Sequence, residues 1–313
     1  MAIKVGVISL GCPKNRVDSE IMLANIMKAG YTVTDNPHDA QVVIVNTCGF
    51  IEDAKTESIE TILEISKIIK NRGGKLIVTG CLAQRYHDEL LADMPEIDAM
   101  LGVYDYDSIT KSIDDVLKGE RTVRVGGSPK YMDAAERIVS TPKHYAYLKI
   151  ADGCDNRCSY CAIPSIRGNY TSRGFDSLVA EAVQLAGSGV REMIVVAQDT
   201  TRYGLDIGLK NGLISLLDAL SAIVGIKMIR IMYAYPESVD EQLFKYISEN
   251  EKICNYLDLP IQHISDRILK LMNRRGGPES IIKAVKLAKK YGVSLRTSVI
   301  AGFPTETEEE FNQ

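Results

Sequence analysis

The cysteines are the residues of this sequence whose spacing is best suited to metal chemistry. Seven cysteines divide into a widely spaced set of three, a closely spaced set of three and a single one. They are Cys12, Cys48 and Cys81, then Cys154, Cys158 and Cys161, and finally Cys254. Because the first residues form a β-strand pattern without a signal-peptide layout, a secreted disulfide framework is not expected. Two sets of three thiols therefore favour metal binding.

The closely spaced set forms a C-x3-C-x2-C loop, Cys154-Asp-Asn-Arg-Cys158-Ser-Tyr-Cys161. Three thiolates on one loop can hold three corners of a [4Fe-4S] cube and leave the fourth iron open for chemistry. A structural zinc site needs four ligands and usually contains a C-x2-C pair. His144 is a possible fourth ligand, but it precedes the adjacent predicted strand and so lies at the wrong end of it. We therefore favour an iron–sulfur cluster over zinc.

The first part of the chain alternates between strand and helix patterns. Apolar, β-branched runs predict strands over 3–10, 42–45 and 75–79, and helical spacing predicts helices over 19–29 and 54–70. This alternation predicts a doubly wound, parallel α/β sheet.

Each of the widely spaced cysteines lies one to three residues past the end of one of these predicted strands. The carboxyl ends of parallel strands form the ligand crevice of an open α/β sheet. We therefore expect Cys12, Cys48 and Cys81 to converge on one edge. The alternative is three separate buried thiols, because free cysteine is often a core residue. Cys254 precedes a predicted buried strand and is expected to be such a core thiol.

The second part restarts the alternation with five strand-then-helix units. Strands are predicted over 145–150, 192–197, 227–232, 256–259 and 294–300, and helices over 177–186, 213–223, 239–248, 266–272 and 280–291. Five such units predict a partial (β/α) barrel with its site at the carboxyl ends of the strands. Residues 118–143 lose the periodicity, so we expect domains over 1–140 and 141–313. The chain stops at 305–313, which resembles the opening of a helix, so we expect a fragment.

Composition and charge restrict the class of protein. The chain has 313 residues, of which 45% are hydrophobic and 25% charged, which excludes a disordered or collagen-like chain. A net charge of −4 offers no basic footprint for nucleic acid. No apolar run of about 18 residues is present, so we expect a cytoplasmic protein without a membrane partner.

The C-x3-C-x2-C loop on a partial barrel resembles the radical S-adenosylmethionine (SAM) superfamily. In this superfamily SAM binds the open iron and is cleaved to a 5′-deoxyadenosyl radical. The resemblance implies that Tyr160 covers the cluster, although plain packing is the alternative. It also implies that Gln198 contacts the SAM amino group and that Gly302 lies near the adenine. His263 follows the fourth barrel strand and is given no role in proton transfer.

Two arginines flank the cysteine loop. Arg157 lies within it and Arg167 follows it. We expect them either to stabilise the negative charge of the cluster or to be solvated.

The N-terminal motifs sharpen the resemblance to methylthiotransferases. They read Ser9-Leu-Gly-Cys12-Pro-Lys-Asn15, Asn46-Thr-Cys48-Gly-Phe50 and Thr79-Gly-Cys81-Leu-Ala-Gln-Arg85. In that family these cysteines hold a second [4Fe-4S] cluster, whose open iron carries the sulfur to be delivered. The match covers nearly the whole chain and implies two [4Fe-4S] clusters and SAM as cofactors.

Two branches of the family differ in substrate. Motifs such as Ala197-Gln-Asp-Thr-Thr-Arg-Tyr-Gly204 and Leu259-Pro-Ile-Gln-His263 resemble the branch that modifies the β-carbon of a ribosomal-protein aspartate (RimO-like). This implies a small-subunit ribosomal protein of the decoding centre as substrate, with an electron donor and a sulfur source as partners. The alternatives are methylthiolation of adenosine in tRNA (MiaB-like) and a non-enzymatic binding module. Family members continue to a sixth barrel strand and a TRAM domain, so the resemblance implies that the chain is truncated before both.

Overall fold

The structure is a computed structural model that describes residues 2–129 and 136–313. The chain divides into two compact units. The first contains Met1–Ser140 and Ser165–Gly168, and the second contains Thr141–Pro164 and Asn169–Gln313. The linker predicted over 118–143 includes residues 130–135, which lie outside the described residues. Within the described ranges, no helix is long and apolar enough to span a membrane.

The first unit is built on a six-stranded sheet in which all neighbours are parallel, in the order β2-β1-β3-β4-β5-β6. Its strands are β1 (Lys4–Ser9), β2 (Thr32–Thr34), β3 (Val42–Thr47), β4 (Lys75–Gly80), β5 (Ala99–Leu101) and β6 (Thr122–Arg124). The chain passes from β1 to β2 on one side and then to β3 on the other. This reversal confirms the doubly wound prediction and places a switch point between β1 and β3.

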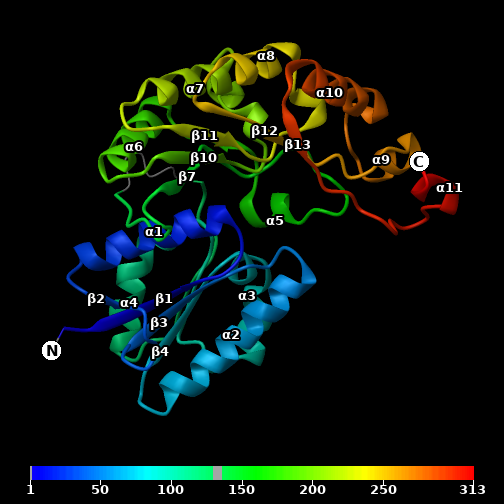
Figure 1. Cartoon of the computed structure of the whole chain (residues 1–313). Coiled ribbons are helices and arrows are strands. Elements are labelled where there is room, and N and C mark those ends of the chain that lie inside the picture. Colours follow the sequence, from blue (N-terminus) through cyan, green and yellow to red (C-terminus); the bar gives the residue numbers. More distant parts are fainter. Residues whose placement is uncertain (1, 130–135) are drawn as a thin grey trace. The chain divides into compact units, whose positions relative to one another are not determined.

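Helices cover both faces of this sheet (Figure 1). They are α1 (Pro13–Lys28), α2 (Glu52–Lys70), α3 (Cys81–Asp93) and α4 (Ile109–Leu117), with a 3-10 turn at Tyr106–Ser108. On one face Ile26 of α1 and Val116 of α4 pack in one buried cluster. On the other, Ile62 and Ile69 of α2 pack with Leu82 of α3. The apolar residues of α2 recur at helical spacing, which directs one face of the helix onto the sheet.

Two predictions in the first unit were wrong. Helix α1 begins at Pro13 rather than at residue 19. Its first turns were missed because Lys14, Asn15 and Asp18 are polar yet buried. Polar residues on the buried face conceal the amphipathic pattern that reveals a helix. Strand β6 lies within the stretch predicted to be a linker, and it is a short edge strand whose residues are partly exposed.

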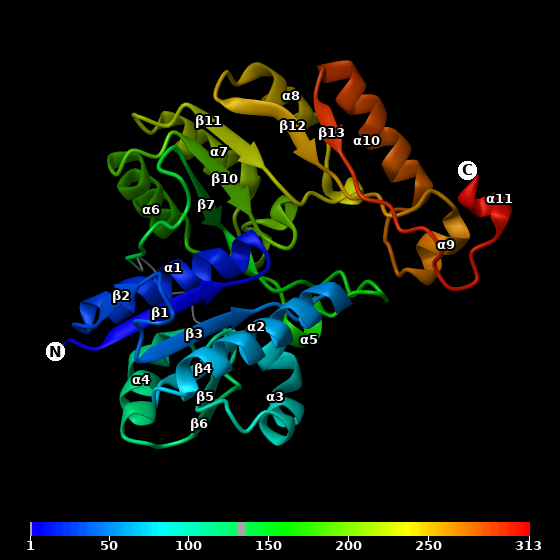
Figure 2. The same cartoon turned by 60° about the horizontal axis from the view of Figure 1, so that its bottom comes forward.

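The second unit is a five-stranded parallel sheet in the sequential order β7-β10-β11-β12-β13. Its strands are β7 (Tyr145–Lys149), β10 (Glu192–Val196), β11 (Met228–Ile231), β12 (Ile253–Asp258) and β13 (Ser294–Arg296), and β8 (Ala151–Asp152) pairs separately with β9 (Thr171–Ser172). Figure 2 shows helices α6 (Phe175–Gly187), α7 (Gly212–Ala222), α8 (Glu241–Glu249) and α10 (Gly277–Tyr291) along the sheet. The shorter helices are α5 (Ile163–Arg167), α9 (Asp266–Leu271) and α11 (Glu308–Phe311), with 3-10 turns at Thr200–Arg202, Leu205–Ile207 and Pro236–Ser238. Sequential parallel strands, each followed by a helix, confirm the partial barrel.

Some boundaries in the second unit differ from prediction. Strand β12 begins at Ile253, so Cys254 lies within the strand, where it is half-buried rather than a core thiol. Strand β13 ends at Arg296 instead of residue 300, and beyond it Val299 pairs with Gln262 in an isolated bridge. The helix expected at the end of the chain is α11, which a capping box opens.

Candidate metal centres

The three N-terminal cysteines lie at the carboxyl ends of three adjacent strands of the first unit. Cys12 is the residue before α1, Cys48 follows β3 directly, and Cys81 is the first residue of α3, directly after β4. Because β1, β3 and β4 are neighbours in the sheet, their ends bring the three thiols to one edge, beside the switch point. We call Cys12, Cys48 and Cys81 the N-terminal cysteine site.

Two glycines allow the loops of this site to approach closely. Gly11 has φ +85°, and a Cβ there would lie 2.7 Å from Cys48 Cβ. Gly80 has φ +96°, and a Cβ there would lie 2.3 Å from Asn46 Oδ1 and 2.5 Å from the Thr47 carbonyl oxygen. Both positions have a positive φ, which glycine adopts without a steric cost. The site therefore depends on glycine immediately before Cys12 and Cys81.

The buried side chain of Asn15 joins all three loops of the site. Its Nδ2 donates to the Thr47 carbonyl at 2.8 Å, and its backbone carbonyl accepts from Asn46 Nδ2 at 2.9 Å. Its Oδ1 lies 3.6 Å from Cys81 Sγ, which donates to it. Asn15 and Asn46 belong to the quoted cysteine motifs, but nothing in the sequence indicated that they bond to each other.

The electrostatics of the site favour negative charge. Helix α1 begins directly after Cys12 and α3 begins at Cys81, so the positive ends of two helix dipoles lie at these thiols. Burial alone would raise the pKa of the Cys12 thiol, but Lys14, Arg167 and nearby backbone N–H groups together lower it. Burial raises the pKa of Cys48, and it raises that of Cys81 to about 11 although Arg167 opposes the shift. Binding to a metal would replace the protons of these thiols.

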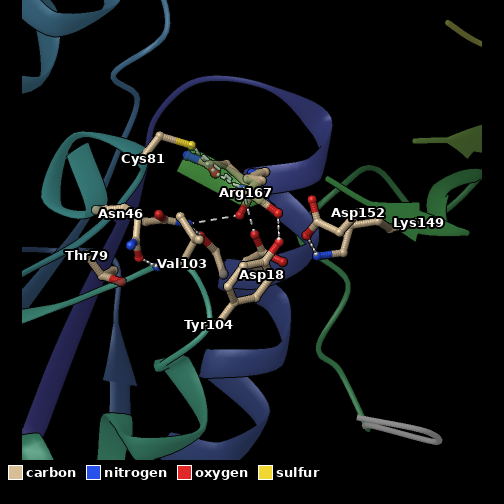
Figure 3. Close-up of polar contacts among 12 residues, drawn as sticks. Asp18, Asn46, Thr79, Cys81, Val103, Tyr104, Lys149, Asp152 and Arg167 are labelled. Carbon is tan, nitrogen blue, oxygen red and sulfur yellow. Dashed lines mark hydrogen bonds and ion pairs between the residues drawn. The ribbon is translucent and has the colours of Figure 1, made fainter. Parts of the chain in front are cut away.

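Arg167 is the most buried charged group at this site, with 1% of its surface exposed. Its Nη2 donates to Asn15 Oδ1 at 2.6 Å, pairs with Asp18 Oδ2 at 3.0 Å and lies 3.8 Å from Cys81 Sγ. Figure 3 shows the side chain between Cys81 and Asp18, and the Tyr104 hydroxyl donates to its carbonyl oxygen. We expected Arg167 to stabilise the negative charge of the cluster at the C-x3-C-x2-C loop or to be solvated. The expectation of solvation was wrong, because the side chain is buried and its segment, Ser165–Gly168, packs with the first unit.

The second set of cysteines lies in the second unit, on the loop after β8. Cys154 and Cys158 are buried and Cys161 is half-buried. The Cys161 N–H donates to the Cys158 carbonyl at 3.0 Å, and Arg157 between the cysteines has φ +53°. This tight turn, with a left-handed residue in it, holds the three thiols on one short loop. We call Cys154, Cys158 and Cys161 the barrel cysteine site.

Asp199 anchors this loop, and we did not predict that role. It is fully buried and accepts from Asn156 Nδ2 at 3.0 Å and from the Thr201 N–H at 3.1 Å. The Tyr170 hydroxyl donates to its backbone carbonyl at 2.9 Å. Burial raises the pKa of Asp199, while the bonds from Thr201 and Asn156 oppose the shift. Asp199 follows β10, so its position at a strand end was the available signal.

The turn between α9 and α10 also holds the loop. Met272 accepts from the Ser159 N–H at 3.0 Å, and Asn273 Nδ2 donates to the Arg157 carbonyl at 2.8 Å. The guanidinium of Arg274 lies over the Tyr235 ring, 4.4 Å from its centroid. Burial raises the pKa of Tyr235, and the nearby cysteines add to that rise. No local pattern in the sequence marks this turn as part of the site.

The three residues predicted to contact SAM belong to the second unit. Tyr160 is half-buried, and burial together with the neighbouring Cys158 raises its pKa. Gln198 is half-buried just after β10, next to Asp199. Gly302 is exposed with φ +73°, and a Cβ there would contact nothing within 4 Å. Their roles stay predictions.

Both histidines considered above belong to the second unit. His263 accepts from the Ser265 N–H through Nδ1 at 2.9 Å, and its Nε2 lies 3.2 Å from Glu306 Oε1. His144 directly precedes β7, at the amino end of the sheet. Among the described residues, no three His, Cys, Asp or Glu side chains converge closely enough to hold a single metal ion. In an iron–sulfur cube each thiolate binds its own iron, so its three cysteines need not share one ion. The all-thiol donor sets fit such a cluster.

Family comparisons match both units. Residues 4–102 match Uncharacterized protein family UPF0004, and residues 148–313 match the Radical SAM superfamily. The chain is 51% identical over 314 residues to ribosomal protein uS12 methylthiotransferase RimO of Clostridium tetani, which covers 99% of this chain and 70% of that protein. It is 48% identical to the protein of the same name in Caldicellulosiruptor saccharolyticus, covering 99% of this chain and 72% of the relative.

Solved structures support the fold. The radical S-adenosylmethionine methyltransferase TsrM from Kitasatospora setae has a TM-score of 0.74 at 15% identity and covers 99% of this chain and 71% of its own. The cobalamin-dependent S-adenosylmethionine radical enzyme OxsB has a TM-score of 0.67 at 12% identity and covers 99% of this chain and 51% of its own. The relatives at about 50% identity and the Radical SAM match show that the chain belongs to the uS12 methylthiotransferase RimO family of radical SAM enzymes.

Proposed function

We propose that this chain adds a methylthio group to the β-carbon of an aspartate in ribosomal protein uS12. The observation that carries the proposal is the pair of three-cysteine sites, one at the strand ends of each unit, in a chain that is 51% identical to a uS12 methylthiotransferase. The names of the relatives favour the ribosomal protein over adenosine in tRNA as substrate.

We propose that each cysteine site holds one [4Fe-4S] cluster. The barrel cysteine site would hold the cluster that binds SAM, and the N-terminal cysteine site would hold the second. When bound, these cofactors supply the sulfur, the methyl group and the radical that removes hydrogen from the unactivated substrate carbon. Side-chain acid–base groups cannot break such a bond. The protein therefore contributes positioning and electrostatics.

The chain's own residues would perform that positioning at the barrel site. Asp199 and the turn at Met272–Asn273 hold the cysteine loop from two sides. Tyr160 would cover the cluster, and Gln198 and Gly302 would contact SAM. Support for these contacts comes from the proximity of Tyr160 to Cys158, from the place of Gln198 beside Asp199, and from the open, left-handed backbone of Gly302.

The remaining partners follow from the chemistry. Reductive cleavage of SAM requires an electron donor, and each product consumes one sulfur, so a sulfur source is required. The substrate is a ribosomal protein, free or on the ribosome. We place the reaction in the cytoplasm, because ribosomes and a reducing environment are found there.

Iron and sulfide analysis of the anaerobically reconstituted chain tests the cofactors. We expect about eight irons and eight sulfides per chain. Both the iron and the sulfide content should fall to about four per chain in Cys154→Ala/Cys158→Ala/Cys161→Ala, and likewise in Cys12→Ala/Cys48→Ala/Cys81→Ala. SAM cleavage under reducing conditions should persist in the second variant and vanish in the first. One zinc per chain without sulfide would refute the assignment.

Mass spectrometry decides the substrate. The chain is incubated with SAM, sulfide and reductant in the presence of uS12 or of tRNA. We expect a methylthio group on one aspartate of uS12 and none on tRNA. Modification of adenosine alone would refute the proposed substrate while leaving the enzyme class intact.

A further inference from the structure

We propose that Arg167 compensates the negative charge of the cluster held at the N-terminal cysteine site. The inference rests on the proposed function, because it requires a cluster at that site. The residue lies outside the cysteine motifs, and it reaches the site through the short segment Ser165–Gly168. It would act on the cluster through charge and hydrogen bonding rather than as a ligand.

The geometry places a fixed positive charge beside the thiols. Arg167 Nη2 lies 3.8 Å from Cys81 Sγ and 2.6 Å from Asn15 Oδ1, while only 1% of the residue is exposed. Asn15 Oδ1 in turn lies 3.6 Å from Cys81 Sγ, and Asn15 Nδ2 donates to Thr47, the last residue of β3, directly before Cys48. A guanidinium stays protonated in proteins, so this charge persists whatever the state of the thiols. Buried from water, its field is weakly screened.

Asp18 explains how the buried charge is tolerated before a cluster is present. Its Oδ2 pairs with Arg167 Nη2 at 3.0 Å, and its side chain is 6% exposed. The pair is close to neutral, so it contributes little net charge of its own. Thiolates and a cluster add negative charge to a site that already contains Asp18. With a cluster bound, Arg167 would have two anionic partners, Asp18 and the cluster, and the balance between them would set the local potential.

A structural role is the competing explanation, because Arg167 also fastens its own segment to the first unit. The Tyr104 hydroxyl donates to its carbonyl oxygen, and its guanidinium bonds to α1 through Asn15 and Asp18. A purely structural role predicts that any substitution in the pair weakens packing. Charge compensation predicts opposite effects when the positive or the negative partner is neutralised, because net charge and hydrogen bonds to sulfur set cluster potentials.

The experiment measures the midpoint potential of the cluster in full chains that carry Cys154→Ala/Cys158→Ala/Cys161→Ala. This background leaves the N-terminal cysteine site as the only proposed cluster site. The cluster is titrated anaerobically with dithionite and ferricyanide and followed by electron paramagnetic resonance. In this background Arg167→Gln should make reduction at least tenfold less favourable, a shift of about 59 mV to more negative potential. Asp18→Asn should shift the potential to more positive values.

Two further variants control for packing. Arg167→Lys keeps the charge and should lie between Arg167→Gln and the unaltered residue. Arg124→Gln breaks an ion pair with Asp115 in the same unit and should leave the potential unchanged. If Arg167→Gln fails to fold or to hold iron, the upward shift in Asp18→Asn remains the test. Unchanged potentials, or shifts of the same sign in both neutralised variants, would overturn the inference. Absence of iron in the background itself would instead refute the proposed second cluster.

Discussion

Replacing Gly80 by alanine is expected to destabilise the first unit by about 2–6 kcal/mol. Gly80 has φ +96°, and an alanine Cβ would lie 2.3 Å from Asn46 Oδ1 and 2.5 Å from the Thr47 carbonyl oxygen. This backbone, with φ +96° and ψ −159°, is adopted essentially by glycine alone and costs another residue about 1–3 kcal/mol. The contacts add about 1–3 kcal/mol, as overpacking does in a tightly packed core. The two effects act on β3 and β4, which end at the N-terminal cysteine site.

Gly30→Ala is the control, because it also places a non-glycine residue at a positive φ but creates no close contact. Gly30 has φ +88°, but a Cβ there would meet nothing within 4 Å. We therefore expect it to cost only about 1–2 kcal/mol. The difference of about 1–3 kcal/mol between the variants should make the core amides of β3 and β4 exchange about 5- to 150-fold faster in Gly80→Ala.

Native-state hydrogen exchange is the appropriate assay, since a chain of two units need not unfold in one step. Exchange is followed by mass spectrometry at fixed pH in all three proteins. Iron content at the N-terminal cysteine site provides a second readout, which should fall in Gly80→Ala and be retained in Gly30→Ala. If the amides of the two variants exchange equally fast, the close contacts at Gly80 do not destabilise the first unit as we expect.

Phe244 of α8 is fully buried, so Phe244→Ala should destabilise the fold by about 3–5 kcal/mol. Phe311 is 61% exposed, so Phe311→Ala should change the free energy of unfolding by less than about 0.5 kcal/mol. Equal shifts of the two variants in thermal melts would contradict this packing. Asp199→Ala removes the buried acceptor of the barrel cysteine loop and should cost about 1–3 kcal/mol, seen as faster exchange in that loop with the first unit unchanged. Hydrogen bonding from Arg267 lowers the pKa of Glu310 to about 2, against about 4.3 in an unfolded chain. The ionised Glu310 therefore stabilises α11 fully above pH ~4.3, and this stabilisation is lost as the pH falls through about 2. Exchange of the α11 amides should therefore accelerate only in that acidic range, and Arg267→Gln should shift the change to higher pH.

The sequence was sufficient to predict how the cysteines group, because that depends on local patterns. Runs such as 42–45 are recognisable as buried strands, and in a parallel sheet the strand ends meet at one edge. The convergence of Cys12, Cys48 and Cys81 follows from that rule. The same patterns could not assign the buried polar residues of α1 to a helix, because their burial depends on partners elsewhere in the chain.

Contacts between distant segments escaped prediction. Arg167 and Asn15 are 152 positions apart, and Ser159 and Leu271 are 112 apart. The local sequence of neither segment in such a pair indicates that it contacts the other. Arg167 lies six positions after Cys161 in the sequence. That proximity suggested the barrel site, whereas its buried side chain bonds to the first unit.

The backbone of the second unit supports the view that its strand ends form the functional edge. Tyr233, after β11, has φ +63°, and Gln262, after β12, has φ +70°. Such conformations cost about 1–3 kcal/mol each and persist where surrounding contacts enforce them. Here the Tyr233 N–H donates to Asp258 Oδ2 at 3.3 Å and the Gln262 N–H donates to the Ser298 carbonyl at 2.9 Å. These bonds hold side chains at the same sheet edge in fixed directions, which a site that binds SAM and positions a radical requires. Since neither residue type favours this conformation, the strain could be found only in the folded chain.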